Sequence, residues 1–245
     1  MTDTPTAPVH PLRAAVRRTR AAASTVMDRS ETLLDPVVRP LVEATQRRRG
    51  GPSADDLLDH YREGRFLGVG RWGRFVWMSP RHRAVVPLAE RHIPRRVRQL
   101  HRSGKFTVTY DTAFADVLHH CATVNGRSAG ARPWLTPEVQ QSYLSLHERG
   151  LAHSVESWRD GRLVGGEIGV AINGYFSADT TFHLEANASK VAFADLLDHL
   201  AARGFLLLDT QVLSRATSPF GARKLPRAEF HSTLHGALTA DVSFS

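Results

Sequence analysis

The chain has 245 residues, of which 42% are hydrophobic, enough for one large domain or for one domain with a smaller unit. No apolar stretch approaches the roughly 20 residues of a membrane span, and the first residues lack the continuous apolar segment of a secretory signal. The single cysteine, Cys121, excludes an intrachain disulfide and a zinc site built from several cysteines. We therefore expect a soluble, cytoplasmic protein that does not interact with a membrane.

The formal net charge of +8 fits a polyanionic partner. A genome that favours codons for Arg and Ala would give the same balance, and Arg greatly outnumbers Lys here. Charge alone leaves these two explanations open.

Residues 1–52 differ from the rest of the chain. They are rich in Arg and Pro and contain no Phe, Tyr or Trp, so they can contribute little to a core. The run of residues 47–52, RRRGGP, is typical of a linker. We predict a basic extension over residues 1–52 that is mostly disordered or loosely helical.

Helix signals begin at Ser53, which can cap a helix that extends through Tyr61. Residues 71–88 hold two short apolar pieces separated by a polar turn, and FTVTYD, residues 106–111, indicates a strand. A helix is expected between them, from Pro94 at its first position to Gly104 just beyond its end. Another helix, residues 112–122, would be opened by Asp111 or Thr112.

The segment TPEVQQSYLSLHERG predicts a helix with Thr136 as its cap and Gly150 after its last turn. Val139, Tyr143 and Leu146 recur at i, i+4 and i+7 and form its expected core stripe.

A β-hairpin follows, with Asp160-Gly161 as the two-residue turn between alternating segments. GYFSADTTF is a further strand, residues 187–204 are a helix capped by Asn187 and closed by Gly204, and FLLLDTQ is the next strand. The order strand, strand, strand, helix, strand predicts an α/β fold with a mixed sheet and a crossover helix.

Asp209 and Gln211 end this last apolar strand. Strand residues at i and i+2 project to the same side, and a buried carboxylate beside a carboxamide is costly unless both are hydrogen-bonded. The two side chains therefore form either a satisfied structural pair or part of a reaction site.

From about Ser53 to Leu234 the chain resembles the leucyl/phenylalanyl-tRNA–protein transferase family. The resemblance is carried, in order, by LLDHYREGRF, FVWMSPRHRAV, RHIPRRVRQL, VTYDTAFADVLHHCA, WLTPEVQQSYLSLHERGLAHSVESW, LVGGEIGVA, Phe182 with NASK, LLLDTQVL and SPFGARKLPRAEF. Each piece is a weak signal, but their order and spacing over about three quarters of the chain are specific.

The resemblance implies a GNAT-like mixed sheet with flanking helices. We expect a small N-terminal unit over residues 53–110 and a catalytic domain over residues 111–245. The implied activity moves Leu, Phe or Met from an aminoacyl-tRNA onto the N-terminal Arg or Lys of an acceptor protein, which marks that protein for degradation. No cofactor is implied, and the spacing of the histidines predicts no metal site.

The implied reaction is aminolysis of an ester, which needs positioning, a proton acceptor and support for the oxyanion. Asp209 and Gln211 match the family's D-x-Q pair, and the resemblance implies that Asp209 orients and polarises the Gln211 amide, which then helps to take the proton of the amine. Glutamine is a poor base, so a direct role for Asp209 or for the tRNA stays open.

The resemblance also implies substrate-binding residues. Asp179 stands where the family has a Glu and would recognise the cationic acceptor residue, or would merely cap a strand. Trp77 and Trp134 match family tryptophans near the donor side chain, although ordinary core packing explains both equally well. Met78 replaces a second Trp of the family, and this adaptable side chain could shift or broaden the donor preference. The family's N-A-S-K motif corresponds to the positions Asn187, Ser189 and Lys190.

The tRNA needs cationic contacts. Arg95, Arg98 and Arg102 fall at i, i+3 and i+7 on one face of a predicted helix, and we assign them with Arg83 and Lys190 to tRNA binding. A helix face that is only solvated gives the same pattern.

Two other functions remain open. The family's glycine-rich turn is replaced by RRRGGPSADD, and such divergence suits a tRNA-binding adaptor that has lost catalysis on the same scaffold. An acetyl-CoA-dependent N-acetyltransferase would need a pyrophosphate loop, and Arg127-Ser128-Ala129-Gly130-Ala131-Arg132 only approaches that pattern before Pro133 interrupts it.

Overall fold

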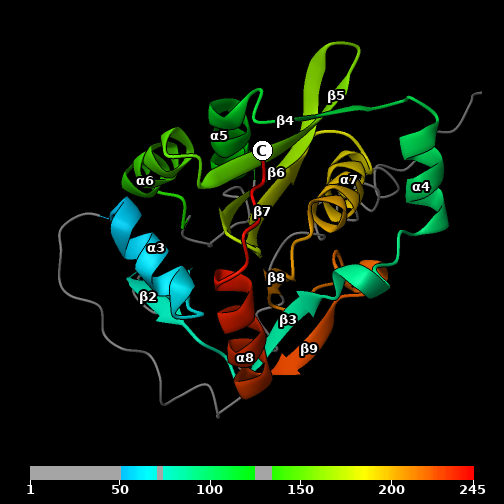
Figure 1. The fold of residues 1–245 in the computed structure, drawn as a ribbon. Helices are drawn as coiled ribbons and strands as arrows, with labels where there is room; N and C mark the ends of the chain where they lie inside the picture. Colours follow the sequence, from blue (N-terminus) through cyan, green and yellow to red (C-terminus); the bar gives the residue numbers. More distant parts are fainter. Residues whose placement is uncertain (1–50, 71–73, 125–133) are drawn as a thin grey trace, which may run out of the picture.

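A computed structural model describes residues 51–70, 74–124 and 134–245 (Figure 1). The basic extension predicted for residues 1–52 lies outside this part except for Gly51 and Pro52, as does the loop of residues 127–132. Within the described ranges, no helix is long and apolar enough to cross a membrane.

A seven-stranded mixed sheet forms the centre of the fold, with strand order β4-β5-β6-β7-β8-β3-β9. Among the described strands, only β7 and β8 pair in parallel, and the crossover helix α7 joins them, so the predicted mixed sheet is confirmed. The strands are β3 (His82–Val86), β4 (Thr107–Tyr110), β5 (Ala152–Arg159), β6 (Arg162–Ile172), β7 (Tyr175–His183), β8 (Leu207–Gln211) and β9 (Arg223–Pro226).

Helices cover both faces of this sheet (Figure 1). One apolar cluster includes residues of α3 (Ala54–Arg62), α5 (Phe114–Val124), α6 (Pro137–Glu148) and α8 (Arg227–Leu238). A second cluster includes residues of α4 (Arg95–Arg102) and α7 (Ala188–Arg203). A separate two-stranded sheet is made of β1 (Phe66–Val69) and β2 (Phe75–Met78), and short 3-10 turns span Leu88–Glu90 and Ser218–Phe220.

Three local predictions from the sequence are confirmed: a helix cap, a core stripe and a hairpin turn. Ser53 caps α3 in a reciprocal capping box with Asp56, and the expected stripe of Val139, Tyr143 and Leu146 on α6 is fully buried. The Asp160-Gly161 turn has positive φ at both residues, 51° and 71°, as a two-residue hairpin of this type requires.

Other ends differ from the prediction. Pro94 is the N-cap of α4 rather than its first residue, and α5 begins only at Phe114. Asp111 accepts hydrogen bonds from the Ser154 backbone and from His153, so its side chain joins two strands instead of opening a helix. Asn187 precedes α7 in the left-handed region without a side-chain cap hydrogen bond.

The expected unit of residues 53–110 is not set apart from the large sheet. β3 lies between β8 and β9, and β4 forms the opposite edge of the same sheet. The sheet therefore crosses the expected boundary at residue 110, and α3 with the β1–β2 hairpin packs against its core.

The parallel pair β7–β8 is short and is flanked by two irregularities. Pairing ends at Ser177 and Asp209, whereas β7 continues to His183. On β7, Ala178 and Thr180 pair with consecutive β6 residues, so Asp179 is the extra residue of a bulge. On β8, Thr210 is the extra residue opposite β3. Bulges redirect side chains, and these two turn Asp179 and Gln211 toward each other.

Candidate active site at the end of the parallel strand pair

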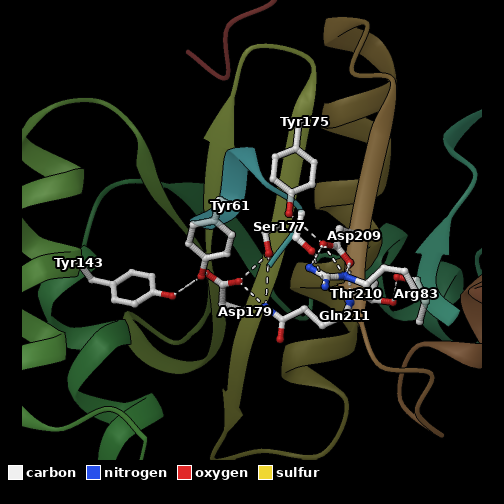
Figure 2. Close-up of polar contacts among 11 residues, drawn as sticks. Tyr61, Arg83, Tyr143, Tyr175, Ser177, Asp179, Asp209, Thr210 and Gln211 are labelled. Atoms are coloured by element: carbon white, nitrogen blue, oxygen red, sulfur yellow. Dashed lines mark hydrogen bonds and ion pairs between the residues drawn. The ribbon is translucent and has the colours of Figure 1, made fainter. Parts of the chain in front are cut away.

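Asp209 is completely buried and paired with Arg83. The Arg83 Nε and Nη2 atoms donate to the Asp209 oxygens at 2.8 and 2.6 Å, and the Tyr175 hydroxyl donates to Oδ2 at 2.8 Å. The Gln211 backbone N–H donates to Oδ1 at 2.7 Å. Such a carboxylate is satisfied on both oxygens, as a buried charge requires (Figure 2).

Arg83 is itself enclosed, at 1% exposure. Its guanidinium carbon lies 4.3 Å from the Phe66 ring centre and 4.8 Å from that of Phe230, and Nη1 donates to the Gly64 carbonyl. A side chain that is this buried is not placed to contact tRNA phosphate, so the expected tRNA-binding role of Arg83 is wrong: Arg83 binds Asp209 instead.

Gln211 connects the buried ion pair to a second carboxylate. Its φ of 61° is unusual for a residue with a side chain, and the Asp209–backbone hydrogen bond supports it. The side-chain amide donates to Asp179 Oδ1 at 2.7 Å. The Asp209 contact is thus with the Gln211 backbone, whereas the resemblance implies one with the side-chain amide.

Asp179 is the centre of the polar network. Tyr61 and Tyr143 donate to its Oδ2 at 2.8 and 2.7 Å, and Ser177 donates to Oδ1 at 2.7 Å (Figure 2). Loss of hydration raises the pKa of Asp179 from 3.8 to about 6, with a further contribution from the charge of Asp209, while its hydroxyl donors oppose the rise. The carboxyl group therefore titrates close to neutral pH.

Sequence reasoning missed the tyrosines of this network. The helical periodicity predicts Tyr143 and Tyr61 as core residues of their helices and gives no partner for either hydroxyl. A buried tyrosine usually finds a partner for its hydroxyl, so two tyrosines on core stripes were the available signal. Burial and the Asp179 charge raise the pKa of both phenols well above 10.0, so both stay protonated.

Glu167 on β6 is a second buried acid near Asp179. It is 1% exposed, and its Oε2 has no hydrogen-bond partner among the residues that the structure describes. Burial, with the Asp179 charge, raises its pKa well above 4.5. Burial thus favours the neutral form of Glu167.

The aromatic residues expected near the donor side chain lie beside this network. Trp134 is partly buried and makes an edge-to-face contact with Tyr143 at 6.0 Å between ring centres. Trp77 is 3% exposed and packs on His60, the residue before Tyr61, at 3.8 Å. Met78 packs against the apolar cluster that contains Trp77, Tyr61 and Tyr143. Trp134 therefore contacts a tyrosine that holds Asp179, and Trp77 belongs to the apolar cluster that contains both tyrosines.

The start of α7 packs closely against β6 of the sheet. A Cβ atom on Gly165 of β6 would lie 2.6 Å from the Ala188 Cβ, so glycine permits this approach. Within the described ranges, no hydrogen bond links the Asn187, Ser189 or Lys190 side chains to Asp179, Asp209 or Gln211. Lys190 is exposed.

The cationic face of α4 is on the surface. Arg95, Arg98 and Arg102 are exposed, while Val97 anchors the helix in the second apolar cluster. His101 instead points to Asp195 of α7, at 2.6 Å. Among the described residues, no group of three or more His, Cys, Asp and Glu is placed to hold a metal ion.

The fold and this network define an α/β protein with a polar site. The site combines the titratable carboxyl group of Asp179, the neighbouring Gln211 amide and the buried Arg83–Asp209 ion pair. A model of the leucyl/phenylalanyl-tRNA protein transferase family matches residues 85–235. The chain belongs to this family.

Curated relatives agree. The chain is 43% identical over 188 residues to a leucyl/phenylalanyl-tRNA–protein transferase of Nitratidesulfovibrio vulgaris (strain DP4), covering 77% of this chain and 80% of that protein. It is 38% identical over 191 residues to one of Chlorobaculum tepidum, covering 78% of this chain and 97% of that protein. Among solved structures, the C-terminal domain of a putative lysylphosphatidylglycerol synthetase from Agrobacterium fabrum aligns with 63% of this chain and 56% of that chain. The sequence identity is 13% and the TM-score is 0.39.

Proposed function

We propose that the protein transfers Leu, Phe or Met from an aminoacyl-tRNA to the N-terminal Arg or Lys of acceptor proteins, in the cytoplasm and on a GNAT-like fold. Family membership supports the reaction. The observation that carries the proposal to this chain is the hydrogen-bonded series Arg83–Asp209–Gln211–Asp179, which keeps the family's D-x-Q pair intact at the end of the β7–β8 pair.

The network suits aminolysis of an ester. The donor ester is already activated, so the protein supplies mainly position and a proton acceptor. The Gln211 amide nitrogen donates to Asp179, so the amide oxygen can accept a hydrogen bond from an attacking amine that lies beside this carboxylate (Figure 2). We assign Trp77, Met78 and Trp134 to the side of the donor side chain, because Trp134 contacts Tyr143 and all three pack in the apolar cluster that contains Tyr61 and Tyr143. Asn187 and Ser189 remain candidate substrate contacts on the sequence resemblance alone.

The exposed arginines of α4 are proposed to contact tRNA phosphates, with Lys190 as a further candidate. Replacing Arg95, Arg98 and Arg102 together with Ala should weaken tRNA binding and reduce the dependence of log affinity on log salt by up to about 3. Arg162→Ala, an exposed arginine at the hairpin end, is the matched control. An unchanged salt dependence in the triple variant would place tRNA elsewhere.

The activity is tested by transfer of labelled Leu or Phe from charged tRNA to a peptide that begins with Arg or Lys. Gln211→Ala should reduce transfer strongly, whereas Gln141→Ala, at an exposed position of α6, should leave it unchanged. A folded wild-type protein that binds tRNA but transfers neither residue would establish the adaptor function instead. Binding of acetyl-CoA in calorimetry would support the acetyltransferase.

A further inference from the structure

Asp209 and Asp179 both accept several hydrogen bonds, but Asp209 accepts them from a charged arginine and Asp179 from neutral groups. Asp209 is 0% exposed, and its oxygens are held by Arg83, Tyr175 and the Gln211 backbone. A substrate amine could reach this carboxylate only by displacing a buried arginine. Asp209 is thus a positioning residue: it fixes the Gln211 backbone in the left-handed region and thereby aims the amide at Asp179.

Asp179 is only partly buried and lies where β7 and β8 separate. Its position as the extra residue of the β7 bulge places it on the side of Ser177, Tyr61 and Tyr143. The Gln211 amide reaches the same carboxylate. Asp179 is therefore the carboxylate of this network that adjoins Gln211 without being closed off by an ion pair.

The tyrosine side of Asp179 can hold the carboxyl group in either protonation state. Tyr61 Oη, Tyr143 Oη and Asp179 Oδ2 are mutually in contact, at 2.8, 2.8 and 2.7 Å. When Asp179 is ionised, two phenolic hydrogens serve these three contacts. A proton on Oδ2 gives each contact one hydrogen once one phenolic hydrogen turns to the other phenol oxygen, so the protonated form is accommodated without movement of the oxygen atoms.

We propose that Asp179 is the group that accepts the proton of the attacking amine, a role beyond recognition of the acceptor side chain. This inference rests on the proposed function. The neutral α-amine forms the C–N bond to the aminoacyl carbonyl carbon, and the ester C–O bond to the tRNA breaks. The amine proton passes to Asp179 and then to the departing tRNA oxygen, which leaves as a hydroxyl.

The charges around Asp179 suit this role. Loss of hydration and the charge of Asp209 on β8 raise its pKa, and the hydroxyls of Ser177 on β7, Tyr143 on α6 and Tyr61 on α3 lower it. Burial favours the neutral form of Glu167 on β6. The Arg83 charge on β3 is engaged by Asp209. The resulting value of about 6 leaves Asp179 mostly ionised at neutral pH and lies near the range where proton transfer from an amine is efficient.

The test is the single-turnover rate of transfer from charged tRNA to a peptide with N-terminal Arg, measured from pH 5 to pH 9. We expect Asp179→Asn to lower the rate at saturating peptide by about a hundredfold or more, with the peptide KM changed less than threefold. The acid limb near pH 6 should disappear. Asp179→Glu, which restores a carboxylate, should recover much of the rate.

Asp195→Asn is the matched control, since Asp195 also accepts a tyrosine hydroxyl, that of Tyr110, but lies on α7 outside this network. A large rise in KM for the peptide with an unchanged saturated rate would show acceptor recognition and overturn the proposal. So would an Asp179→Asn variant that keeps the wild-type rate and pH profile. Failure of the proposed function is a separate outcome, in which the wild-type protein transfers nothing at any pH.

Discussion

Breaking the Arg83–Asp209 ion pair should strongly destabilise the protein. Arg83→Met keeps an unbranched side chain between Phe66 and Phe230 but removes the three guanidinium hydrogen bonds of 2.6 to 3.0 Å to Asp209. Asp209 is 0% exposed and would keep only the Tyr175 hydroxyl and one backbone N–H. A buried charge that loses its partner costs about 3–5 kcal/mol.

The free energy of unfolding, from urea denaturation followed by circular dichroism, measures this loss. Arg91→Met is the matched control: it breaks a partly exposed pair with Asp198 and should cost less than about 1 kcal/mol. Combining Arg83→Met with Asp209→Asn should cost less than the sum of the two single variants, by about 0.5–3 kcal/mol, because neither charge is then left alone. A loss below about 1 kcal/mol for Arg83→Met, or strict additivity, would refute the reasoning.

Three further predictions concern stability. Because the folded-state pKa of Asp179, about 6, exceeds its ordinary 3.8, the wild type should lose stability relative to Asp179→Asn as the pH rises from about 4 to about 6, and a pH-independent difference in urea denaturation would contradict this. Gly165→Ala should cost about 1–3 kcal/mol, since the new Cβ lies 2.6 Å from that of Ala188, whereas Gly236→Ala, in open space on α8, should stabilise by about 0.5–1 kcal/mol; equal thermal shifts would exclude the proposed close approach. Phe244→Ala should cost about 3 kcal/mol, because this C-terminal ring is 3% exposed, and an unchanged melting temperature would show that the tail does not contribute to the core.

The network gives the two residues of the D-x-Q pair different expected roles: Asp209 positions Gln211, and Gln211 takes part in the transfer reaction. Asp209 acts through the Gln211 backbone, so its replacement should disturb the orientation of Gln211 and the stability of the core together. Gln211 can be shortened without leaving a buried charge. Activity lost in Gln211→Ala with stability intact, set against activity and stability lost together in Asp209→Ala, would support this division.

The sequence alone determined the features that depend on neighbouring residues. Apolar residues at i, i+4 and i+7 predicted the buried face of α6, and Asp160-Gly161 predicted the hairpin turn. The order of strands and helices indicated the mixed sheet, and the motif order indicated the family. The helix stripe and the hairpin turn are read within a few residues, where periodicity and turn geometry fix the backbone, and the two orders are read directly along the chain.

Only the tertiary structure decided the partners of the site. Arg83 and Asp209 are 126 residues apart, and Tyr61 and Asp179 are 118 apart, so no local pattern pairs them. The bulges at Asp179 and Thr210 break the two-residue alternation from which side-chain direction was inferred. The sequence suggests Arg83 as an exposed phosphate contact, but the structure buries it as the ion-pair partner of Asp209. Burial and strand register are properties of the whole sheet, so local sequence could not predict this pairing.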